Sequence, residues 1–474
     1  MGSGNAPASG SRRAACAENR GEQLIDRLRN HFRGMTATKM IVLGYSTLIL
    51  LGGCLLMLPH ATRDGQGASL KDAMFTSASV TCVTGMTLHD TYHYWSLFGQ
   101  LIQLVLIELG GLGFMSVMIF LLSFTKRKIG VKQRFVMQEA YSAPQVGGIV
   151  RMTQYIFFSS LAIELVGAAM LCLYFCPRLG ALRGIFFSVF HSVSAFCNAG
   201  IDLMGYFSPG SSLMDVASDP FLNGVFMVLI IVGGLGFFVW FDVIEHRHHF
   251  AKYRLHTKLV LVTSGVLILL GAVQIFLLEH GGEAMAGCST GEEWLRSLFQ
   301  SVTCRTAGFF TMDLSAMTEA TQFVCICLML VGGSSGSTAG GLKTTTLALL
   351  FLSITVVFRK RKTVECFHRR IEEEAIHNAC CVLMLYLLLL IVSSVSICAI
   401  ESIGLLDSLF ECAAALGTAG LTLGLTARLS ALSQVILMFL MFVGRVGGLS
   451  VLLALGTTSG NVASQYPLEK VTVG

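Results

Sequence analysis

The chain has 474 residues and a formal net charge of +5, and 54% of its residues are hydrophobic while only 13% are charged. This composition is far more apolar than that of a soluble globular protein, so it excludes a soluble fold and indicates a chain built for lipid. The 15 cysteines include no CxxC pair and lie mostly in apolar tracts. They therefore predict small membrane-core residues rather than a disulfide or zinc framework.

Residues 1–37 are polar, and we expect a cytosolic N-terminal segment that is partly disordered. Eight apolar tracts follow, and most reach the roughly 20 residues that cross a bilayer core. They are 40–59, 99–124, 155–176, 221–241, 259–278, 321–358 (interrupted), 380–400 and 433–456. The sequence therefore predicts an all-α membrane protein with eight transmembrane helices, followed by a short cytosolic tail at 459–474.

Lysine and arginine residues fall mainly on one side of these predicted spans. With both chain ends on the same side, 24 of the 33 lie there, and seven lie opposite: Arg63, Lys71, Arg178, Arg183, Arg296, Arg305 and Arg428. Because basic residues are retained in the cytoplasm, both termini of this multi-pass plasma-membrane protein are expected to be cytosolic. Lys343 and Arg445 are left within the membrane. His246, His248 and His249 lie in a basic loop, which favours a solvated connection over a metal site.

Four short apolar stretches, each too brief to span a membrane, end in glycine turns. They are FTSASVTCVTGM (75–86), FHSVSAFCNAGID (190–202), FQSVTCRTAGFFTMD (299–313) and FECAAALGTAGLTLGLT (410–426). If their turn glycines Gly85, Gly200, Gly308 and Gly420 are equivalent, the separations are 115, 108 and 112 residues, a near-constant period. We therefore divide the chain into repeats at 38–130, 131–250, 251–365 and 366–458.

Each repeat is predicted to contain a span, a re-entrant pore helix, a glycine turn and a second span. Non-spanning backbone is tolerated at membrane depth only where it is buried in protein or lines a water-filled cavity, and four copies in a pseudo-fourfold arrangement satisfy that condition. Turn carbonyls would replace the hydration shell of a cation, and pore-helix C-termini favour positive charge. The candidate selectivity-filter residues are Val83, Thr84, Gly85, Asn198, Ala199, Gly200, Thr306, Ala307, Gly308, Thr418, Ala419 and Gly420.

A second glycine cluster follows each turn. The clusters start near Gly110, Gly233, Gly332 and Gly444, at offsets of 25, 33, 24 and 24 residues from the turn glycines. At 332–341, five glycines stand among serines and threonines, a composition that breaks helices. We therefore expect a loop within the membrane here, and only in the third repeat. A small-residue face for close helix packing explains GGLGF at 110–114 and 233–237.

These motifs resemble those of the superfamily of Trk, Ktr and HKT potassium transporters, over roughly residues 38–456. The most specific are TCVTGM, SAFCNAGID, QSVTCRTAGF, GTAGLTLGLT and the run GGSSGSTAGGLKTTT at 332–346. The resemblance implies four span–pore–span units around one pore. It also implies potassium selectivity, since in this family glycine in all four turns goes with potassium and serine in the first with sodium. The fourth turn departs most from the others.

The same resemblance implies that the loop at 332–346 is a gating loop below the filter. Its candidate residues are Gly332, Gly333, Gly336, Ser337, Thr338, Gly340, Gly341 and Lys343. The first span starts near residue 40, which leaves no room for the additional N-terminal spans of Trk-type subunits. Within the superfamily the chain is therefore most similar to the Ktr-type membrane subunit, KtrB.

Similarity to KtrB implies a homodimer in the lipid membrane, with one pore per subunit. It also implies docking on a cytosolic KtrA-like ring that binds ATP and ADP. The chain itself contains no GxxxxGK[ST] and no GxGxxG opening a strand–helix unit. We therefore expect it to bind no cofactor and no nucleic acid, with K⁺ as the transported ion and Na⁺ as a candidate activator.

Arg445 stands in the apolar run MFVGRVGGLS, where an unpaired cation is costly, so a role as a gate charge is expected. It would repel cations or pair with oxygens of the loop, and the alternative is snorkelling or a structural pairing, for example with Glu108. Asp90, Asp202 and Asp313 follow the first three turns. They either draw cations into the outer mouth or cap surface turns.

The predicted function is potassium uptake across the plasma membrane through the filter, gated by the loop and regulated by the nucleotide-binding partner. The alternative is a cation-coupled secondary transporter of the same fold, a sodium– or proton–potassium symporter. The sequence leaves open whether flux is channel-like or ion-coupled. No convergent His, Asp or Ser constellation indicates an enzyme.

Overall fold

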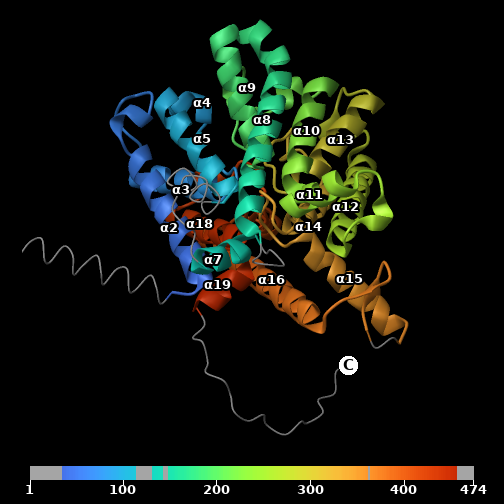
Figure 1. Ribbon diagram of the computed structural model, residues 1–474. Coiled ribbons are helices and arrows are strands. Elements are labelled where there is room, and N and C mark those ends of the chain that lie inside the picture. The colour runs from blue at the N-terminus through green and yellow to red at the C-terminus, as the bar shows by residue number, and fades with distance from the viewer. Residues whose placement is uncertain (1–34, 114–130, 142–147, 361–362, 456–474) are drawn as a thin grey trace, which may run out of the picture.

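The computed structural model describes residues 35–113, 131–141, 148–360 and 363–455 (Figure 1). The predicted N-terminal segment lies outside the described residues apart from 35–37, and the predicted tail at 459–474 lies outside them entirely. The described chain is almost entirely helical. Its only described sheet is a hairpin of β1 (Glu365–Cys366) and β2 (Arg369–Arg370).

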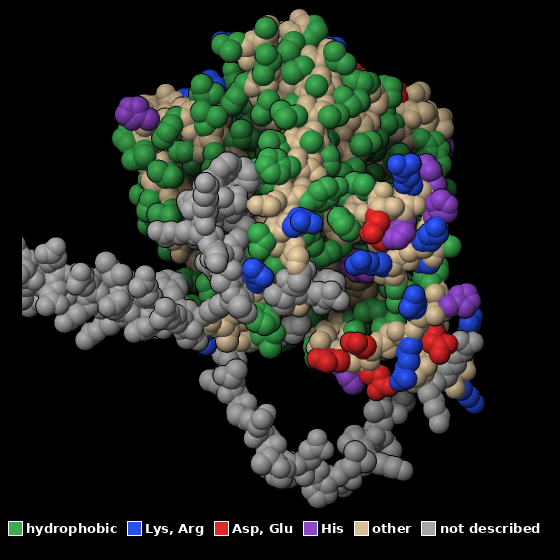
Figure 2. Space-filling view, in the orientation of Figure 1, with side chains coloured by type: hydrophobic (Ala, Val, Ile, Leu, Met, Phe, Trp, Pro, Cys, Tyr) green, Lys and Arg blue, Asp and Glu red, His purple; other side chains and the backbone are tan. Residues whose placement is uncertain are grey.

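Four helices are long and apolar enough to cross a membrane. They are α2 (Ala37–Leu56), α8 (Ile149–Leu179), α12 (Leu255–Glu279) and α16 (Glu373–Glu401). Only 28–33% of each apolar stretch is buried inside the protein, so these helices form part of its apolar outer wall. Figure 2 shows hydrophobic side chains over the upper part of one face, with charged side chains gathered below, near the segment 245–258 and the β hairpin.

A shorter helix follows each long one, and we call these four the pre-turn helices. They are α3 (Leu70–Thr81), α9 (Ala181–Phe196), α13 (Thr290–Thr303) and α17 (Leu405–Leu416). Each packs against the long helix of its own repeat. Asp72 and Asp407 lie in the first turns of α3 and α17, where a carboxylate stabilises the helix N-terminus.

In each of the four repeats, a serine hydroxyl of the pre-turn helix donates to a backbone carbonyl of the adjacent long helix. Ser77 donates to the Ile49 carbonyl over 2.7 Å, Ser192 donates to the Glu164 carbonyl over 2.7 Å, and Ser301 donates to the Ile268 carbonyl over 2.8 Å. In the fourth repeat, Ser408 makes the corresponding bond to the Ser394 carbonyl over 2.7 Å. The same polar contact therefore recurs inside all four helix pairs.

Four post-turn helices complete the repeats: α5 (Leu97–Gly111), α10 (Pro220–Leu235), α14 (Glu319–Leu330) and α18 (Ala431–Val446). Three of them are followed by a further helix: α11 (Phe237–His246), α15 (Thr344–Phe358) and α19 (Gly448–Leu455). The remaining helices are α4 (Thr91–Tyr94) and α7 (Val131–Tyr141), with 3-10 turns at Pro59–Ala61, Met204–Tyr206, Met214–Val216, Phe250–Lys252, Glu283–Met285 and Thr426–Arg428.

The sequence did not predict helix breaks outside the third repeat, but the second and fourth repeats have them as well. The axes of α10 and α11 are bent by 97° at Gly236, which has φ +95°. Helices α18 and α19 are separated at Gly447, with φ +92°, and α5 ends at Gly111. The physical reason is that each break occurs at the second glycine cluster, where a left-handed glycine ends the helix. Among the described residues, only the third repeat extends the break into a loop.

The second glycine clusters also allow a very close helix approach. A Cβ at Gly110 would lie 2.1 Å from the Thr81 carbonyl oxygen, at the end of the pre-turn helix of the same repeat. The corresponding distance from Gly233 to the Phe196 carbonyl oxygen is 1.9 Å, and a Cβ at Gly444 would lie 2.1 Å from the Leu416 carbonyl oxygen. Close packing of small residues was the interpretation given to GGLGF, and the contacts of Gly110 and Gly233 confirm it.

Candidate functional site

The turns after the four pre-turn helices share an unusual backbone. In each turn the first and third candidate residues have positive φ: +56° at Val83 and +93° at Gly85, +60° at Asn198 and +63° at Gly200, +69° at Thr306 and +84° at Gly308, +52° at Thr418 and +78° at Gly420. Val83, Thr306 and Thr418 are β-branched, and such residues avoid this region unless their surroundings enforce it. Strain of this kind concentrates at functional sites.

The four turns meet in a closed ring that follows chain order. A Cβ on each turn glycine would collide with the middle carbonyl of the next turn. The distances are 2.5 Å from Gly85 to the Ala199 oxygen, 2.6 Å from Gly200 to the Ala307 oxygen, 3.0 Å from Gly308 to the Ala419 oxygen and 2.1 Å from Gly420 to the Thr84 oxygen. Only glycine fits these positions without displacing backbone. The structure thus brings all twelve predicted filter residues together.

Hydrogen bonding at the helix ends separates the third turn from the others. In the first, second and fourth turns, the backbone N–H of the middle residue donates to the carbonyl of the residue five positions earlier. These bonds run from Thr84 to Ser79 over 2.8 Å, from Ala199 to Ser194 over 2.7 Å and from Ala419 to Ala414 over 2.8 Å. This is the bond of the Schellman helix end. In the third turn, Ala307 instead donates to Thr303, four residues earlier, over 2.9 Å. The fourth turn, the most divergent in sequence, is regular, and the third is the exception.

In the irregular third turn, Arg305 lies between the helix end at Cys304 and the left-handed Thr306, so this helix ends one residue earlier relative to its turn than the other three helices do. We had counted Arg305 among the outward-facing basic residues, and this was wrong. Its side chain is only 8% exposed, and it donates to Ser264 of α12 and to the Gly332 carbonyl. The sequence signal was present, because QSVTCRTAGF has one more residue between cysteine and glycine than the first two turns.

Two buried polar side chains support the segments after the second and fourth turns. The Leu203 N–H donates to His191 Nε2 over 3.1 Å, and the Leu423 N–H donates to Glu411 Oε1 over 3.0 Å. Each acceptor lies nine residues before the turn glycine and each donor three residues after it. Glu411 also accepts from the Thr426 hydroxyl over 2.6 Å. We missed Glu411 in the sequence, although a lone acid in FECAAALG is a signal.

The three acidic residues after the first three turns make local hydrogen bonds. Asp90 accepts from the His93 N–H over 2.9 Å at the start of α4. Asp202 accepts from the Met204 N–H over 3.0 Å, and Asp313 accepts from the Ser315 N–H over 2.9 Å. These bonds match the turn-capping alternative.

The predicted loop connects α14 to α15 and is bonded to two other repeats. The Ser334 N–H donates to the Gly234 carbonyl over 3.0 Å, and the Phe237 N–H at the start of α11 donates to the Gly336 carbonyl over 2.8 Å. On the opposite side, the Gly341 N–H donates to the Gly444 carbonyl over 3.2 Å. The loop therefore lies between the broken helices of the second and fourth repeats.

The loop also touches the turn region directly. The Thr338 hydroxyl donates to the Phe196 carbonyl at the end of α9, over 3.1 Å, and a Cβ on Gly340 would lie 2.3 Å from the Thr418 hydroxyl. The other candidates bond or pack within the loop. Gly332 packs on Gly340, the Gly333 carbonyl accepts from Thr344, Ser337 donates to the Ser334 carbonyl, and Lys343 Nζ donates to the Ala339 carbonyl over 2.9 Å.

Arg445 joins this loop to the first repeat. Its guanidinium donates to the carbonyls of Thr338 and Gly110, and to the Gly111 carbonyl over 2.7 Å. Within the described chain, Arg445 forms no ion pair with Glu108 or with any other carboxylate. These contacts therefore match the prediction that Arg445 pairs with oxygens of the loop, and they do not match the alternative in which Arg445 pairs with Glu108.

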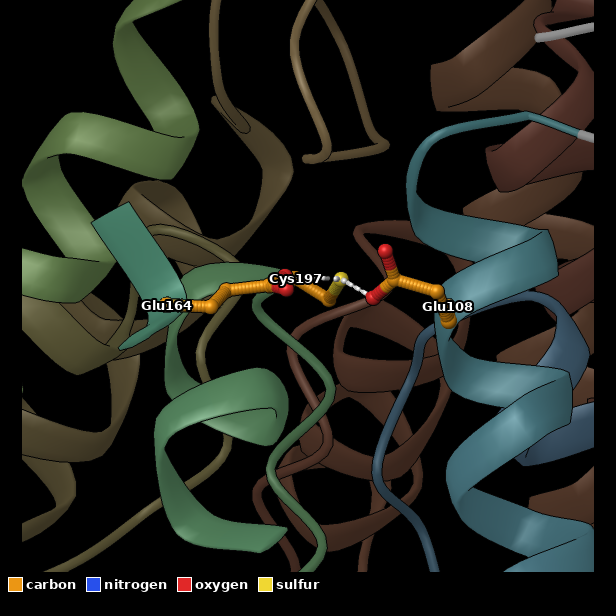
Figure 3. A group of neighbouring side chains, drawn as sticks. All are labelled: Glu108, Glu164 and Cys197. Atoms are coloured by element: carbon orange, nitrogen blue, oxygen red, sulfur yellow. Dashed lines mark hydrogen bonds between the residues drawn. The ribbon is translucent and has the colours of Figure 1, made fainter. Parts of the chain in front are cut away.

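Glu108 instead belongs to a buried group behind the second turn, shown in Figure 3. The Cys197 thiol lies between two carboxyl groups, 3.7 Å from Glu108 Oε2 and 3.9 Å from Glu164 Oε1. The three side chains come from α5, from α8 and from the end of α9. Their contacts join the first and second repeats next to Asn198.

The sequence matches the family described as "TrkH: Cation transport protein" over residues 22–463. It is 36% identical to the potassium/sodium uptake protein NtpJ of Enterococcus hirae, covering 93% of this chain and 98% of that protein. It is also 36% identical to the Ktr system potassium uptake protein B of Bacillus subtilis, covering 93% and 97%. The potassium transporter TrkH of Vibrio parahaemolyticus shares the fold, with a TM-score of 0.69 at 19% identity over 88% of this chain and 84% of that one.

The family match covers nearly the whole described chain, including all four turns and the loop. Both relatives align with this chain over almost their full lengths. The chain therefore belongs to the TrkH family of cation transport proteins.

Proposed function

We propose that this protein takes up potassium ions through a pathway formed by the four turns, and that it is not an enzyme. The observation that carries the proposal is the closed ring, in which each turn glycine contacts the middle carbonyl of the next turn. Backbone carbonyls that replace water ligands are how potassium pathways select their ion. The names of the relatives support the same ion, since the proteins from Enterococcus and Bacillus are called potassium uptake proteins.

The proposal includes an arrangement of eight spans and four pore helices. The four long helices supply the first spans, and the post-turn helices supply the second spans. In the second, third and fourth repeats the second span continues, beyond a break near mid-membrane, into α11, α15 and α19. The pre-turn helices are the pore helices, and the four repeats keep the predicted boundaries at 38–130, 131–250, 251–365 and 366–458. The charged side chains near 245–258 and the β hairpin mark the cytosolic side in this proposal, which puts both termini there in the plasma membrane.

The loop at 332–346 is proposed as the gate of this pathway. Its support is contact with the turn region at Phe196 and Thr418, together with bonds to the second and fourth repeats. Arg445 is the proposed gate charge, because it donates to the Thr338 carbonyl in the middle of the loop. An open pathway requires this segment to leave its present position.

A homodimer docked on a cytosolic KtrA-like ring, with ATP and ADP acting on that ring, is the proposed assembly. Its support is the relative named as protein B of a Ktr system, a name that implies another subunit. Sodium is proposed as an activator or co-transported ion, because the name of NtpJ includes both ions.

Purified protein in liposomes tests the function. Potassium uptake should exceed sodium uptake under equal gradients and should continue without an exchanged organic solute. Equal uptake of the two ions would defeat the proposed selectivity. Strict dependence of potassium uptake on a sodium or proton gradient would favour the symporter alternative.

A further inference from the structure

Three basic side chains each donate to a backbone carbonyl of the loop, and of the three Arg305 is buried while Lys343 and Arg445 are partly buried. Arg445 donates to Thr338 and Lys343 donates to Ala339, both in the middle of the loop. Arg305 donates to Gly332, at the start of the loop, over 3.4 Å. The first two residues were predicted from sequence as gate elements. Arg305 was not, although it is the one that also belongs to a turn.

Arg305 lies between the early end of α13 and the left-handed Thr306, in the one turn where the regular Schellman bond is absent. Its guanidinium fastens this turn to α12 instead: Nη2 donates to the Ser264 hydroxyl over 3.2 Å and Nη1 to the Ser264 carbonyl over 3.4 Å. The same Nη2 reaches Gly332. One side chain therefore connects the third turn, its long helix and the start of the loop.

Polar contacts as well as close packing hold the loop at this point. A cavity of about 10 Å³, the size of one water molecule, lies between Arg305, Ser264 and Gly333. No carboxylate of the described chain forms an ion pair with Arg305, and its Nε has no hydrogen-bond partner. Backbone and hydroxyl oxygens are therefore its only described acceptors, and Gly332 is the one that belongs to the loop.

We propose that Arg305 is a positioning residue that couples the third turn to the loop, so that one side chain sets both ion selectivity and closure. This inference rests on the proposed function. With the guanidinium bonded to Gly332, the loop is anchored at its start and the irregular turn is held against α12. Without these bonds, the start of the loop is released and the third turn loses a support that the other turns do not need.

Flux measurements on Arg305→Gln and Arg305→Lys test the coupling, in liposomes that contain only this chain. Glutamine removes the charge and most donors, so partner-independent potassium uptake should rise about fivefold and the potassium-to-sodium ratio should fall about fivefold. Lysine keeps the charge and should fall between wild type and glutamine in both measurements. Arg183→Gln, an exposed arginine on α9, is the matched control and should change neither.

Combining variants distinguishes the proposed coupling role of Arg305 from a purely structural role. In an Arg445→Ala background the loop has already lost its central anchor, so Arg305→Gln should add little to flux but should still lower the ion ratio. If Arg305→Gln does not fold, Ser264→Ala removes the hydroxyl partner and should move both quantities in the same direction by less. When Arg445 is intact, a change in only one of the two quantities, or in neither, overturns the coupling. Failure of the proposed function is distinct, because wild type would then show no potassium preference.

Discussion

Gly420 offers a sharp test of the closed ring, because a matched glycine lies four residues later and outside the ring. Gly420 has φ +78° and Gly424 has φ +82°. Alanine at either position therefore meets the same left-handed backbone, which costs an L-residue roughly 1–2 kcal/mol. A Cβ at Gly420 would lie 2.1 Å from the Thr84 carbonyl oxygen, whereas nothing lies within 4 Å of a Cβ at Gly424. The two variants share the backbone strain and differ in the clash.

Relief of the clash requires the Thr84 carbonyl to move. Ordinary contact begins at 3.4 Å, so an oxygen at 2.1 Å must retreat by about 1.3 Å. A carbonyl that replaces a water ligand acts at coordination distance, and a displacement of this size removes that ligand from the ion. We expect Gly420→Ala to lower the potassium-to-sodium uptake ratio about tenfold, which corresponds to about 1.4 kcal/mol of lost discrimination.

The assay compares both variants with wild type in liposomes, under equal potassium and sodium gradients. Thermal unfolding of the purified proteins in detergent provides the second measurement. Gly424→Ala should keep the uptake ratio within about twofold of wild type while showing the strain cost in its thermal stability. An unchanged ratio in Gly420→Ala, or an equal fall in Gly424→Ala, would refute the ring.

Three further predictions concern the supports of the turns and the loop. Arg445→Ala should raise potassium uptake about fivefold in the absence of a partner, because the loop loses its central anchor, and unchanged uptake kinetics in folded protein would remove this role. Glu411→Gln replaces a buried acceptor by an amide, so the free energy of unfolding should fall by about 1–3 kcal/mol, and unchanged thermal unfolding would contradict the support it provides. Gly233→Ala should destabilise by about 1–3 kcal/mol, because its Cβ would lie 1.9 Å from the Phe196 carbonyl oxygen. Gly224→Ala in the same helix meets nothing within 4 Å and should stabilise by about 0.5–1 kcal/mol, so equal effects of the two would argue against the close approach.

The positions of the four turns could be predicted from sequence because they depend on glycine. Gly85, Gly200, Gly308 and Gly420 recur at a near-constant period, and each stands where a Cβ would collide with the neighbouring turn. A residue type that is required by steric exclusion leaves a periodic signal in the sequence. The second glycine clusters were found for the same reason.

The helix breaks were harder to predict, because the glycines that allow close packing and those that end a helix are the same residue type. Gly233 contacts the Phe196 carbonyl, and Gly236 three residues later turns the chain by 97°. Composition alone distinguished the third repeat, in which serines and threonines extend the glycine run. The sequence could not distinguish a kink from a continuous helix at Gly447 either.

Arg305 and Glu411 were missed for a different reason. Each acts through backbone groups that are remote in sequence, as Arg305 does at Gly332, and backbone acceptors leave no complementary residue type to find. Counting charges by predicted side put Arg305 outside the membrane, because the count assigned every residue between paired spans to the outer side. The longer separation of cysteine and glycine in the third turn was the better signal, since it shows that the helix ends early and the turn needs another support.

Several departures from fourfold regularity lie around the loop, and they indicate how closure is stabilised. Cations without carboxylate partners are costly in an apolar protein, so Arg305, Lys343 and Arg445 depend on the carbonyls that they reach. Lys343 and its acceptor Ala339 both belong to the loop, so their bond moves with the loop. Movement of the loop away from the turns would instead leave donors of Arg305 and Arg445 unsatisfied, at about 1.5–3 kcal/mol for each charged hydrogen bond. Opening therefore needs either water to enter and replace these acceptors or a partner whose binding offsets their loss, and removal of either arginine should lower the threshold.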